Sequence, residues 1–162
     1  MNSEELNIQF LEVKDSAYRY AVSLLHDTTE AEDVVQDLYE RLWRRRLIIR
    51  RVGFRSLVMT TARNMSLDRL RRQRLNRHTA IDDEPLATES PEVDNPVAIV
   101  RMIISHLPER EREIIHLHDV EGMDYEDIAE VVGTSVMAAR MACSRARQKV
   151  KEEFEKIMSY GV

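Results

Sequence analysis

The feature that most constrains this 162-residue chain is an acidic, proline-containing stretch at residues 78–97. It holds three of the four prolines, six acidic residues and no basic residue, and its apolar residues show no regular period. Such a composition is typical of a linker between folded units. The sequence therefore predicts two small domains, 1–76 and 98–160, joined by a flexible acidic linker at 77–97.

Both predicted domains carry the apolar period of an amphipathic helix. We expect helices at 6–26, 29–42 and from residue 54 onward in the first domain, with Thr29 and Glu32 forming a capping box. The residues expected on the inner faces of the first two helices are Phe10, Val13, Ala17, Tyr20, Ala21, Leu24, Leu25, Ala31, Val34, Val35, Leu38 and Leu42. In the third helix, Leu57, Val58, Thr61 and Met65 are expected to face the core. In the second domain, helices are expected at 97–106, 109–119 and 125–132 and from residue 135. The chain has only four glycines and four prolines, which argues against a turn-rich β-sandwich or barrel. The predicted fold class is therefore all-α.

The net charge of −5 conceals an uneven distribution of charge along the chain. Residues 1–40 hold 10 acidic and 2 basic residues, whereas residues 41–77 hold 13 basic and 1 acidic residue. This pattern does not fit a general polyanion binder. It favours one local surface for phosphate groups and other surfaces for different partners, although a solvated basic helix face is the alternative.

Several classes of protein are disfavoured by what the sequence lacks. Its single cysteine, Cys143, excludes a disulfide framework and a cysteine-based zinc site. His116 and His118 are two residues apart on a helix and face different ways, so we expect surface histidines and no metal site. No glycine-rich phosphate loop or catalytic constellation is present, so we expect no cofactor and no enzymatic activity. No apolar run approaches about 18 residues, and the first residues lack signal-peptide features, so a cytoplasmic location without membrane insertion is expected.

The region from Asp124 to Lys151 gives the sharpest local signal. A short helix capped by Asp124, a turn at Gly133 and a basic second helix form a helix-turn-helix pattern. Residues 135–151 hold five basic residues and no acidic one, with small residues on the inner stripe. The pattern favours DNA binding over a helical hairpin with a solvated basic edge.

Three runs of residues in series resemble the extracytoplasmic-function (ECF) group of sigma-70 family sigma factors. These are AEDVVQDLYERLW at 31–43, FRSL to DRLRR at 54–72, and the LPER, EGMDYEDIA and SRAR runs within 107–147. The resemblance covers nearly the whole chain in order. It implies a promoter-specificity subunit that binds core RNA polymerase and promoter DNA, with an anti-sigma factor as a further, unidentified partner.

The resemblance also assigns roles to individual residues. Polar residues on the exposed face of the second helix are expected to bind core polymerase: Asp33, Gln36, Asp37 and Glu40. Residues of the third helix are expected to bind and open the minus-ten element: Arg63, Asn64, Arg69, Arg71 and Arg72. Among these, Asn64 matches the family's reader of a flipped base, in a pocket near residues 44–53.

The last helix is expected to lie in the major groove at the minus-thirty-five element. The contacts implied there are Ser135, Met137, Arg140, Met141, Ser144, Arg145 and Arg147. One departure is that Ala142 stands where the family commonly has a basic residue, so we expect a missing DNA contact there.

Two other interpretations and one local question stay open at this point. A stand-alone helix-turn-helix regulator would bind an operator without polymerase. An enzyme acting on nucleic acid has no metal-binding or acid–base constellation to support it. The sequence leaves open whether Tyr39 and Trp43 are core residues or partner anchors.

Overall fold

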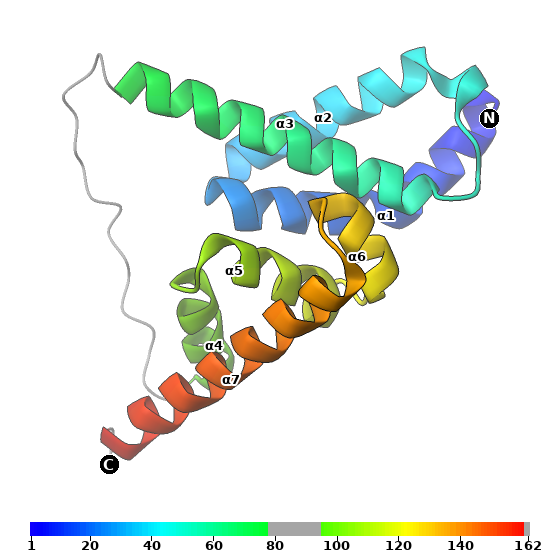
Figure 1. The fold of residues 1–162 in the computed structure, drawn as a ribbon. Helices are drawn as coiled ribbons and strands as arrows, with labels where there is room; N and C mark the ends of the chain where they lie inside the picture. The colour runs from blue at the N-terminus through cyan, green and yellow to red at the C-terminus, as the bar shows by residue number, and fades with distance from the viewer. Residues whose placement is uncertain (78–94, 161–162) are drawn as a thin grey trace.

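The computed structural model describes residues 1–77 and 95–160, and every regular element in these ranges is a helix. The N-terminal module (1–77) contains α1 (Ser3–Leu25), α2 (Thr28–Arg44), the short 3-10 helix η1 (Arg46–Ile48) and α3 (Phe54–Arg77). The C-terminal module (95–160) contains α4 (Pro96–Ser105), α5 (Glu109–Ile115), the π-helical turn η2 (His116–Val120), α6 (Tyr125–Val132) and α7 (Val136–Tyr160). The all-α prediction is confirmed over the described part of the chain (Figure 1). Most of the predicted linker, residues 78–94, lies outside it.

The start of α2 differs from the prediction. Asp27, not Thr29, caps the helix: its backbone is extended, and its carboxylate accepts a 3.1 Å hydrogen bond from the amide of Glu30. A carboxylate suits this position because it also interacts favourably with the positive end of the helix dipole. The predicted Thr29–Glu32 capping box is therefore wrong.

The apolar period correctly predicted the inner faces of α1 and α2 but only part of that of α3, where Val58 is buried as expected. Leu57 is 41% exposed, whereas Met59 and Ala62 are fully buried. The reason is that α3 packs against α1 and α2 and also contacts α6 of the other module. The buried surface of α3 is therefore wider than the predicted stripe and rotated relative to it.

The predicted turn elements of the helix-turn-helix are present. Asp124 accepts a 2.9 Å hydrogen bond from the amide of Asp127 at the start of α6. Gly133 takes a left-handed conformation with φ of 76°, which glycine adopts without strain. Ser135 caps α7 by accepting a 3.1 Å hydrogen bond from the amide of Ala138.

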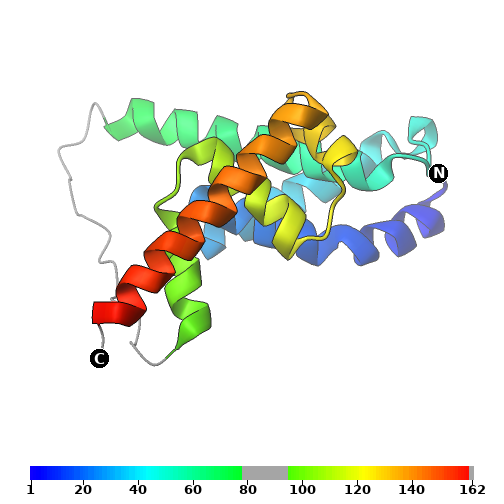
Figure 2. The same ribbon diagram turned by 60° about the horizontal axis from the view of Figure 1, so that its bottom comes forward.

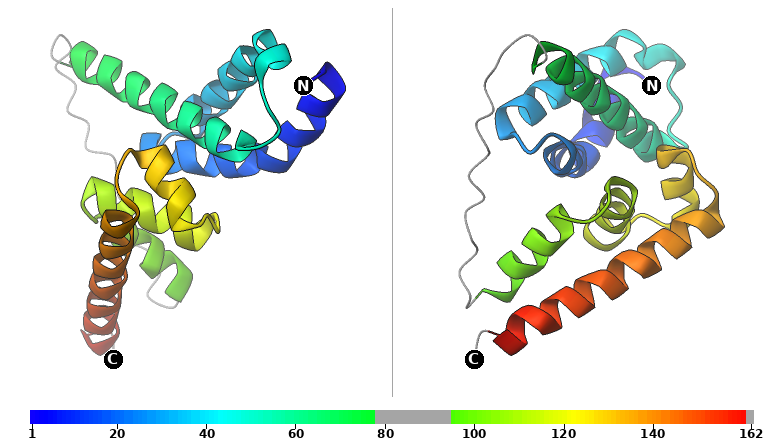
Figure 3. Two further views of the ribbon diagram at one scale, coloured as in Figure 1. Left: turned by 45° about the vertical axis from the view of Figure 1, so that its right-hand side comes forward. Right: turned by 60° about the vertical axis from the view of Figure 1, so that its left-hand side comes forward.

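The two modules pack against each other, an arrangement that the sequence did not predict. α6 lies against the beginning of α3, and η2 contacts α1 (Figures 2 and 3). Buried residues of both modules, including Tyr20 and Met59 on one side and Leu117 and Ile128 on the other, form one apolar cluster. None of the described helices is both long and apolar enough to cross a membrane.

Candidate functional site

The four residues expected to bind polymerase form one exposed stripe along α2. On one side of the stripe, Asp37 lies 2.8 Å and Asp33 lies 3.9 Å from the guanidinium of Arg69 on α3. On the other side, Gln36 lies at the rim of a groove between α1 and α2. The structure thus divides the stripe into an ion-paired edge, with Asp33 and Asp37, and an open edge that includes Gln36.

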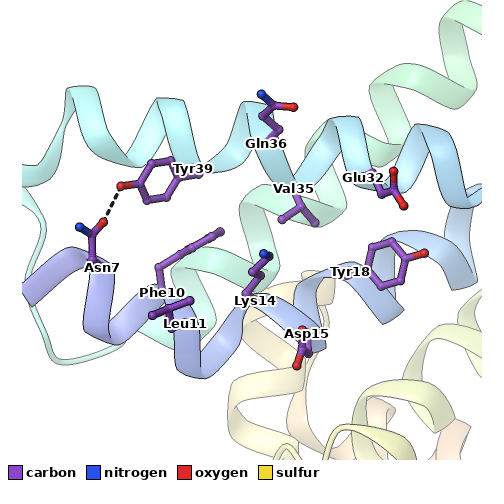
Figure 4. A pocket seen from close by; sticks show the side chains of 10 residues that line it. All are labelled: Asn7, Phe10, Leu11, Lys14, Asp15, Tyr18, Glu32, Val35, Gln36 and Tyr39. Atoms are coloured by element: carbon purple, nitrogen blue, oxygen red, sulfur yellow. Dashed lines mark hydrogen bonds between the residues drawn. The ribbon is translucent and has the colours of Figure 1, made fainter.

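The groove between α1 and α2 has a volume of about 640 Å³ (Figure 4). Its apolar lining comes from Phe10, Leu11 and Val35 together with the rings of Tyr18 and Tyr39. The Tyr39 ring packs 5.1 Å from that of Phe10, so it forms part of the groove wall. The sequence did not single out this groove, although Leu11, 69% exposed and off the inward stripe of α1, was a usable signal.

Trp43 lies one turn beyond Tyr39 and is half-buried. The two rings are 6.1 Å apart, and the Arg46 guanidinium lies 4.5 Å from the centre of the Trp43 ring. Trp43 therefore packs against its own module on one side and carries a cation on its ring. Tyr39 and Trp43 are neither fully buried nor free.

The five residues expected at the minus-ten element do not share one environment. Asn64, Arg71 and Arg72 are exposed on α3. Arg69 is held by Glu30 at 2.7 Å and Asp37 at 2.8 Å, and Arg63 is hydrogen-bonded to Glu113 of the C-terminal module. The structure thus holds Arg63 and Arg69 in contacts with other helices and leaves Asn64 and Arg72 available to a ligand, while Arg71 lies 3.5 Å from the carboxylate of Asp68 on the same helix.

A smaller cavity of about 340 Å³ lies where the η1 loop meets the start of α3. Its apolar lining includes Ile48, Val52 and Leu57, and Thr61 stands at its α3 side. Asn64 follows Thr61 by one helical turn on the same face of α3. A half-apolar cavity beside an exposed amide side chain has the chemistry needed to hold a nucleobase.

Two buried acids from the C-terminal module join the modules electrostatically. The Glu113 side chain is 2% exposed, accepts a hydrogen bond from the Tyr20 hydroxyl and is ion-paired with Arg63. Burial, followed by the charge of Glu113, raises the pKa of the Tyr20 hydroxyl, which therefore stays protonated and donates. Sequence periodicity did not reveal Glu113 as buried, since its partners lie 93 and 50 residues away.

Glu121 makes the second junction. Its buried carboxylate binds the Arg19 guanidinium at 2.6 Å and lies 3.3 Å from Nε2 of His116, while Arg55 donates to its backbone carbonyl. Burial acts to raise the pKa of Glu121, but His116 and Arg19 outweigh it and hold that pKa below 4.5. His116 was expected to be a surface histidine; it is instead 13% exposed at the module interface.

The residues expected at the minus-thirty-five element lie along the N-terminal half of α7, beginning with Ser135 directly before the helix. Met137, Arg140, Met141 and Ser144 are exposed, and Ser135 is engaged as the helix cap. Ala142 is 1% exposed and packs in the core. The missing DNA contact at Ala142 stays a prediction, and the structure adds that this position does not face outward.

The basic residues further along α7 are already paired. Arg145 lies 3.5 Å and Lys149 lies 2.8 Å from the carboxylate of Glu111. Arg147 forms a bidentate ion pair with Asp119 and contacts Nδ1 of His118. The hydrogen bond from Arg147 lowers the pKa of Asp119.

One group of side chains has metal-ligand chemistry. Single ligand atoms of His118, Asp119 and Cys143 lie within 4.8 Å of one another. However, Arg147 hydrogen-bonds to both His118 and Asp119, so a guanidinium already neutralises the carboxylate. We therefore interpret this group as an ion-pair cluster.

Comparison with known proteins agrees with this two-module arrangement. Residues 10–76 match the family described as Sigma-70 region 2, and residues 98–150 match Sigma-70, region 4. The RNA polymerase sigma-H factor of Pseudomonas aeruginosa is 30% identical over 153 residues, covering 85% of this chain and 79% of its own length. The ECF RNA polymerase sigma factor SigE of Mycolicibacterium smegmatis is 27% identical, and the match covers 88% of this chain but 58% of that protein.

Solved structures share the fold. The sigma factor RpoE in complex with the anti-sigma factor NepR from Bartonella quintana matches with a TM-score of 0.73 and 22% identity, covering 94% of this chain and 98% of that one. CnrH in complex with the cytosolic domain of CnrY matches with a TM-score of 0.69 and 23% identity, covering 96% and 90%.

The fold and the surfaces together define an all-helical protein of two modules. The second module contains a helix-turn-helix, and some of the exposed basic side chains of its last helix are ion-paired while Arg140 contacts a ring instead. The matches to region 2 and then region 4 along the chain, together with the match to the P. aeruginosa relative, identify the protein more specifically than its fold does. The chain belongs to the sigma-70 family of RNA polymerase sigma factors, in its ECF group.

Proposed function

We propose that this chain is a promoter-specificity subunit that binds core RNA polymerase and directs initiation at promoters with minus-ten and minus-thirty-five elements. The observation that carries the proposal is the succession of region 2 and region 4 matches in one chain. A stand-alone regulator with one helix-turn-helix has no need of the first of these. In this role the chain contains no catalytic site of its own and acts in the cytoplasm, where the polymerase is.

The open edge of the α2 stripe is the proposed contact with core polymerase. Gln36 and Glu40 are exposed there, and the apolar groove beside Gln36 offers additional contact area. Asp33 and Asp37 contribute charge to the same surface, although Arg69 holds them in the free chain. The domain boundaries proposed for these roles are 1–76 for polymerase and minus-ten binding and 98–160 for minus-thirty-five binding.

The minus-ten element is assigned to α3 and the cavity at its start. Arg71 and Arg72 bind the DNA backbone, and a base flipped from the non-template strand enters the cavity lined by Ile48, Leu57 and Thr61, next to Asn64. The minus-thirty-five element is assigned to the exposed side chains of α7, with Arg140 as the base reader.

A partner of the anti-sigma type also belongs to the proposal. The two sigma factors of similar fold named above were solved in complexes with NepR and with the cytosolic domain of CnrY. Binding of such a partner to the α1–α2 groove would compete with core polymerase for one surface.

The test is transcription in vitro by bacterial core polymerase on genomic fragments, with and without the purified chain. We expect specific transcripts that depend on the chain. Gln36→Arg and Glu40→Arg should each lower core binding about tenfold or more, because a positive charge replaces a polar or acidic group. Glu155→Arg, on an exposed turn of α7, is the matched control and should bind normally. Operator binding with no effect on core polymerase would instead support a stand-alone regulator.

A further inference from the structure

Arg140 differs from the other arginines of α7 in what neutralises it. Arg145 and Arg147 each contact a carboxylate, at Glu111 and Asp119 respectively. Within residues 1–77 and 95–160, Arg140 has no carboxylate partner, and its guanidinium carbon lies 5.2 Å from the centre of the Tyr125 ring. This distance is within the range of a cation–π contact. The charge of Arg140 is thus available to a ligand while its side chain is supported.

Tyr125 is itself held in place by several neighbours. It is the first residue of α6, directly after the capping residue Asp124. Its ring is stacked on that of His118, with centroids 4.3 Å apart and planes 10° from parallel. His118 is in turn hydrogen-bonded to Asp119 at 2.7 Å, and Asp119 is tied to Arg147. The ring is therefore a fixed surface assembled from α6, η2 and α7.

A guanidinium that rests on an aromatic ring keeps its N–H donors free at its edge, because the attraction uses its face. These donors are the ones that hydrogen-bond to O6 and N7 of guanine in the major groove. A free arginine must give up rotamer freedom to read a base, which opposes binding. A side chain that is already supported loses less freedom on binding.

We propose that Tyr125 is a positioning residue that holds Arg140 ready to read a base pair of the minus-thirty-five element without touching DNA itself. This inference rests on the proposed function. It adds a residue on the first helix of the helix-turn-helix to the determinants of promoter specificity. It also explains how discrimination depends on an aromatic face at position 125, and not only on the charges of α7.

The experiment selects DNA from a randomised minus-thirty-five duplex pool fused to a fixed minus-ten element, using holoenzyme assembled with the full chain. Arg140→Ala identifies the base pair that Arg140 reads. Tyr125→Leu keeps apolar volume but removes the ring, and should lower discrimination at that same base pair by about two- to tenfold. Tyr125→Phe keeps the ring face and should retain the wild-type discrimination at that base pair. Tyr160→Leu, at an 89% exposed tyrosine near the end of α7, is the matched control.

Two further readouts separate positioning from general stability. The side-chain proton shifts of Arg140 in the free chain should show a ring-current displacement that is lost in Tyr125→Leu and kept in Tyr125→Phe. In the double variant with Arg140→Ala, Tyr125→Leu should cause no further loss of discrimination.

The possible failures are distinct. If wild-type holoenzyme enriches a motif and Tyr125→Leu enriches it equally, the positioning role is refuted while the proposed function stands. If Tyr125→Leu weakens binding to all sequences alike, with unchanged preference, its role is structural only and the inference is refuted. If the wild-type chain directs polymerase to no sequence, both the proposed function and this inference fail.

Discussion

Two arginines three residues apart on α3 show that charge alone does not identify a DNA contact. The side chain of Arg69 is 24% exposed and is held by Glu30 and Asp37 of α2. Arg72 is exposed and has no ion pair within the described part of the chain. The sequence assigned both to the minus-ten element. Their surroundings indicate that Arg69 stabilises the contact between α2 and α3, whereas Arg72 is available to bind a DNA phosphate.

Replacement of these residues should separate the two roles. Arg69→Ala should lower the free energy of unfolding by about 1 kcal/mol, since its ion pairs are partly exposed. Arg72→Ala should leave stability unchanged, weaken DNA binding on all sequences alike and reduce the salt slope by about 1. Thermal denaturation and holoenzyme binding at several salt concentrations measure these effects. If Arg69→Ala and Arg72→Ala lost DNA affinity equally and both kept their stability, Arg69 would instead be a DNA contact.

Asn64 allows a sharper test because it lies one helical turn from Thr61, which lines a cavity. Asn64→Ala should impair strand opening about fivefold or more, because a pair of hydrogen bonds to a base is worth about 1–3 kcal/mol. Binding to closed duplex should change little. Permanganate reactivity of thymines around the start site, compared with holoenzyme binding to the same promoter, measures the difference. Equal loss of binding and opening would contradict base capture by Asn64.

At the scale of elements, the sequence was most informative for α1 and α2, whose packing partners lie mainly in their own module. The inner faces of α1 and α2 and the cap of α6 followed from local period and capping chemistry. The pattern was only partly correct on α3, where α6 of the other module adds contacts. It also missed that the helix expected at 109–119 continues as the π-helical turn η2. A π-helical turn accommodates an additional residue and changes which side chains share a face.

The candidate site was predictable to a similar degree. The polar stripe of α2 and the exposed face of α7 follow from helical period. The burial of Glu113 does not, because its stabilising partners come from another module. The burial of Ala142 was also missed, since the inner stripe of α7 is one residue wider than the period indicated.

The cap of α6 gives a test at this scale. Asp124→Ala removes the acceptor for the amide of Asp127 and should lower the free energy of unfolding by about 1 kcal/mol. Asp124→Asn keeps a capping acceptor and should preserve most of the stability. Urea denaturation followed by circular dichroism compares the two variants with the wild-type chain. Equal losses in both would show that charge, not capping, matters there.

At the scale of the whole molecule, the buried carboxylate of Glu121 makes stability depend on pH. The pKa of Glu121 is lowered in the folded chain, so its contribution is complete above its ordinary value of 4.5. That contribution is lost as the pH falls below 4.5 toward the lowered folded-state pKa. The urea midpoint of the wild-type chain should therefore fall on acidification through this range. Glu121→Gln should start lower and fall less, and an equal fall in both would contradict this origin.

The packing of the modules conflicts with simultaneous binding to two promoter elements. In the proposed function these elements lie about two helical turns apart, roughly 70 Å. The structure instead joins the modules through Glu113 with Arg63 and Glu121 with Arg19. Arg63 is thereby withheld from the DNA to which the sequence assigned it. Engagement of both elements therefore requires these two junctions to break.

Neutralising the buried acids should favour the separated modules. In Glu113→Gln/Glu121→Gln, Arg63 and Arg19 lose their charged partners, and the loss at Arg63, whose side chain is 20% exposed against 49% for Arg19, costs about 3 kcal/mol. Separation restores hydration of both arginines, so the equilibrium should shift toward open molecules by about a hundredfold. Small-angle X-ray scattering should then show a larger radius of gyration at unchanged helical content. Glu126→Gln/Glu155→Gln, at exposed acids, is the charge-matched control. A radius unchanged in the first variant, with both modules folded, would mean that apolar contacts such as those of Met59 and Ile128 hold the modules together without the ion pairs.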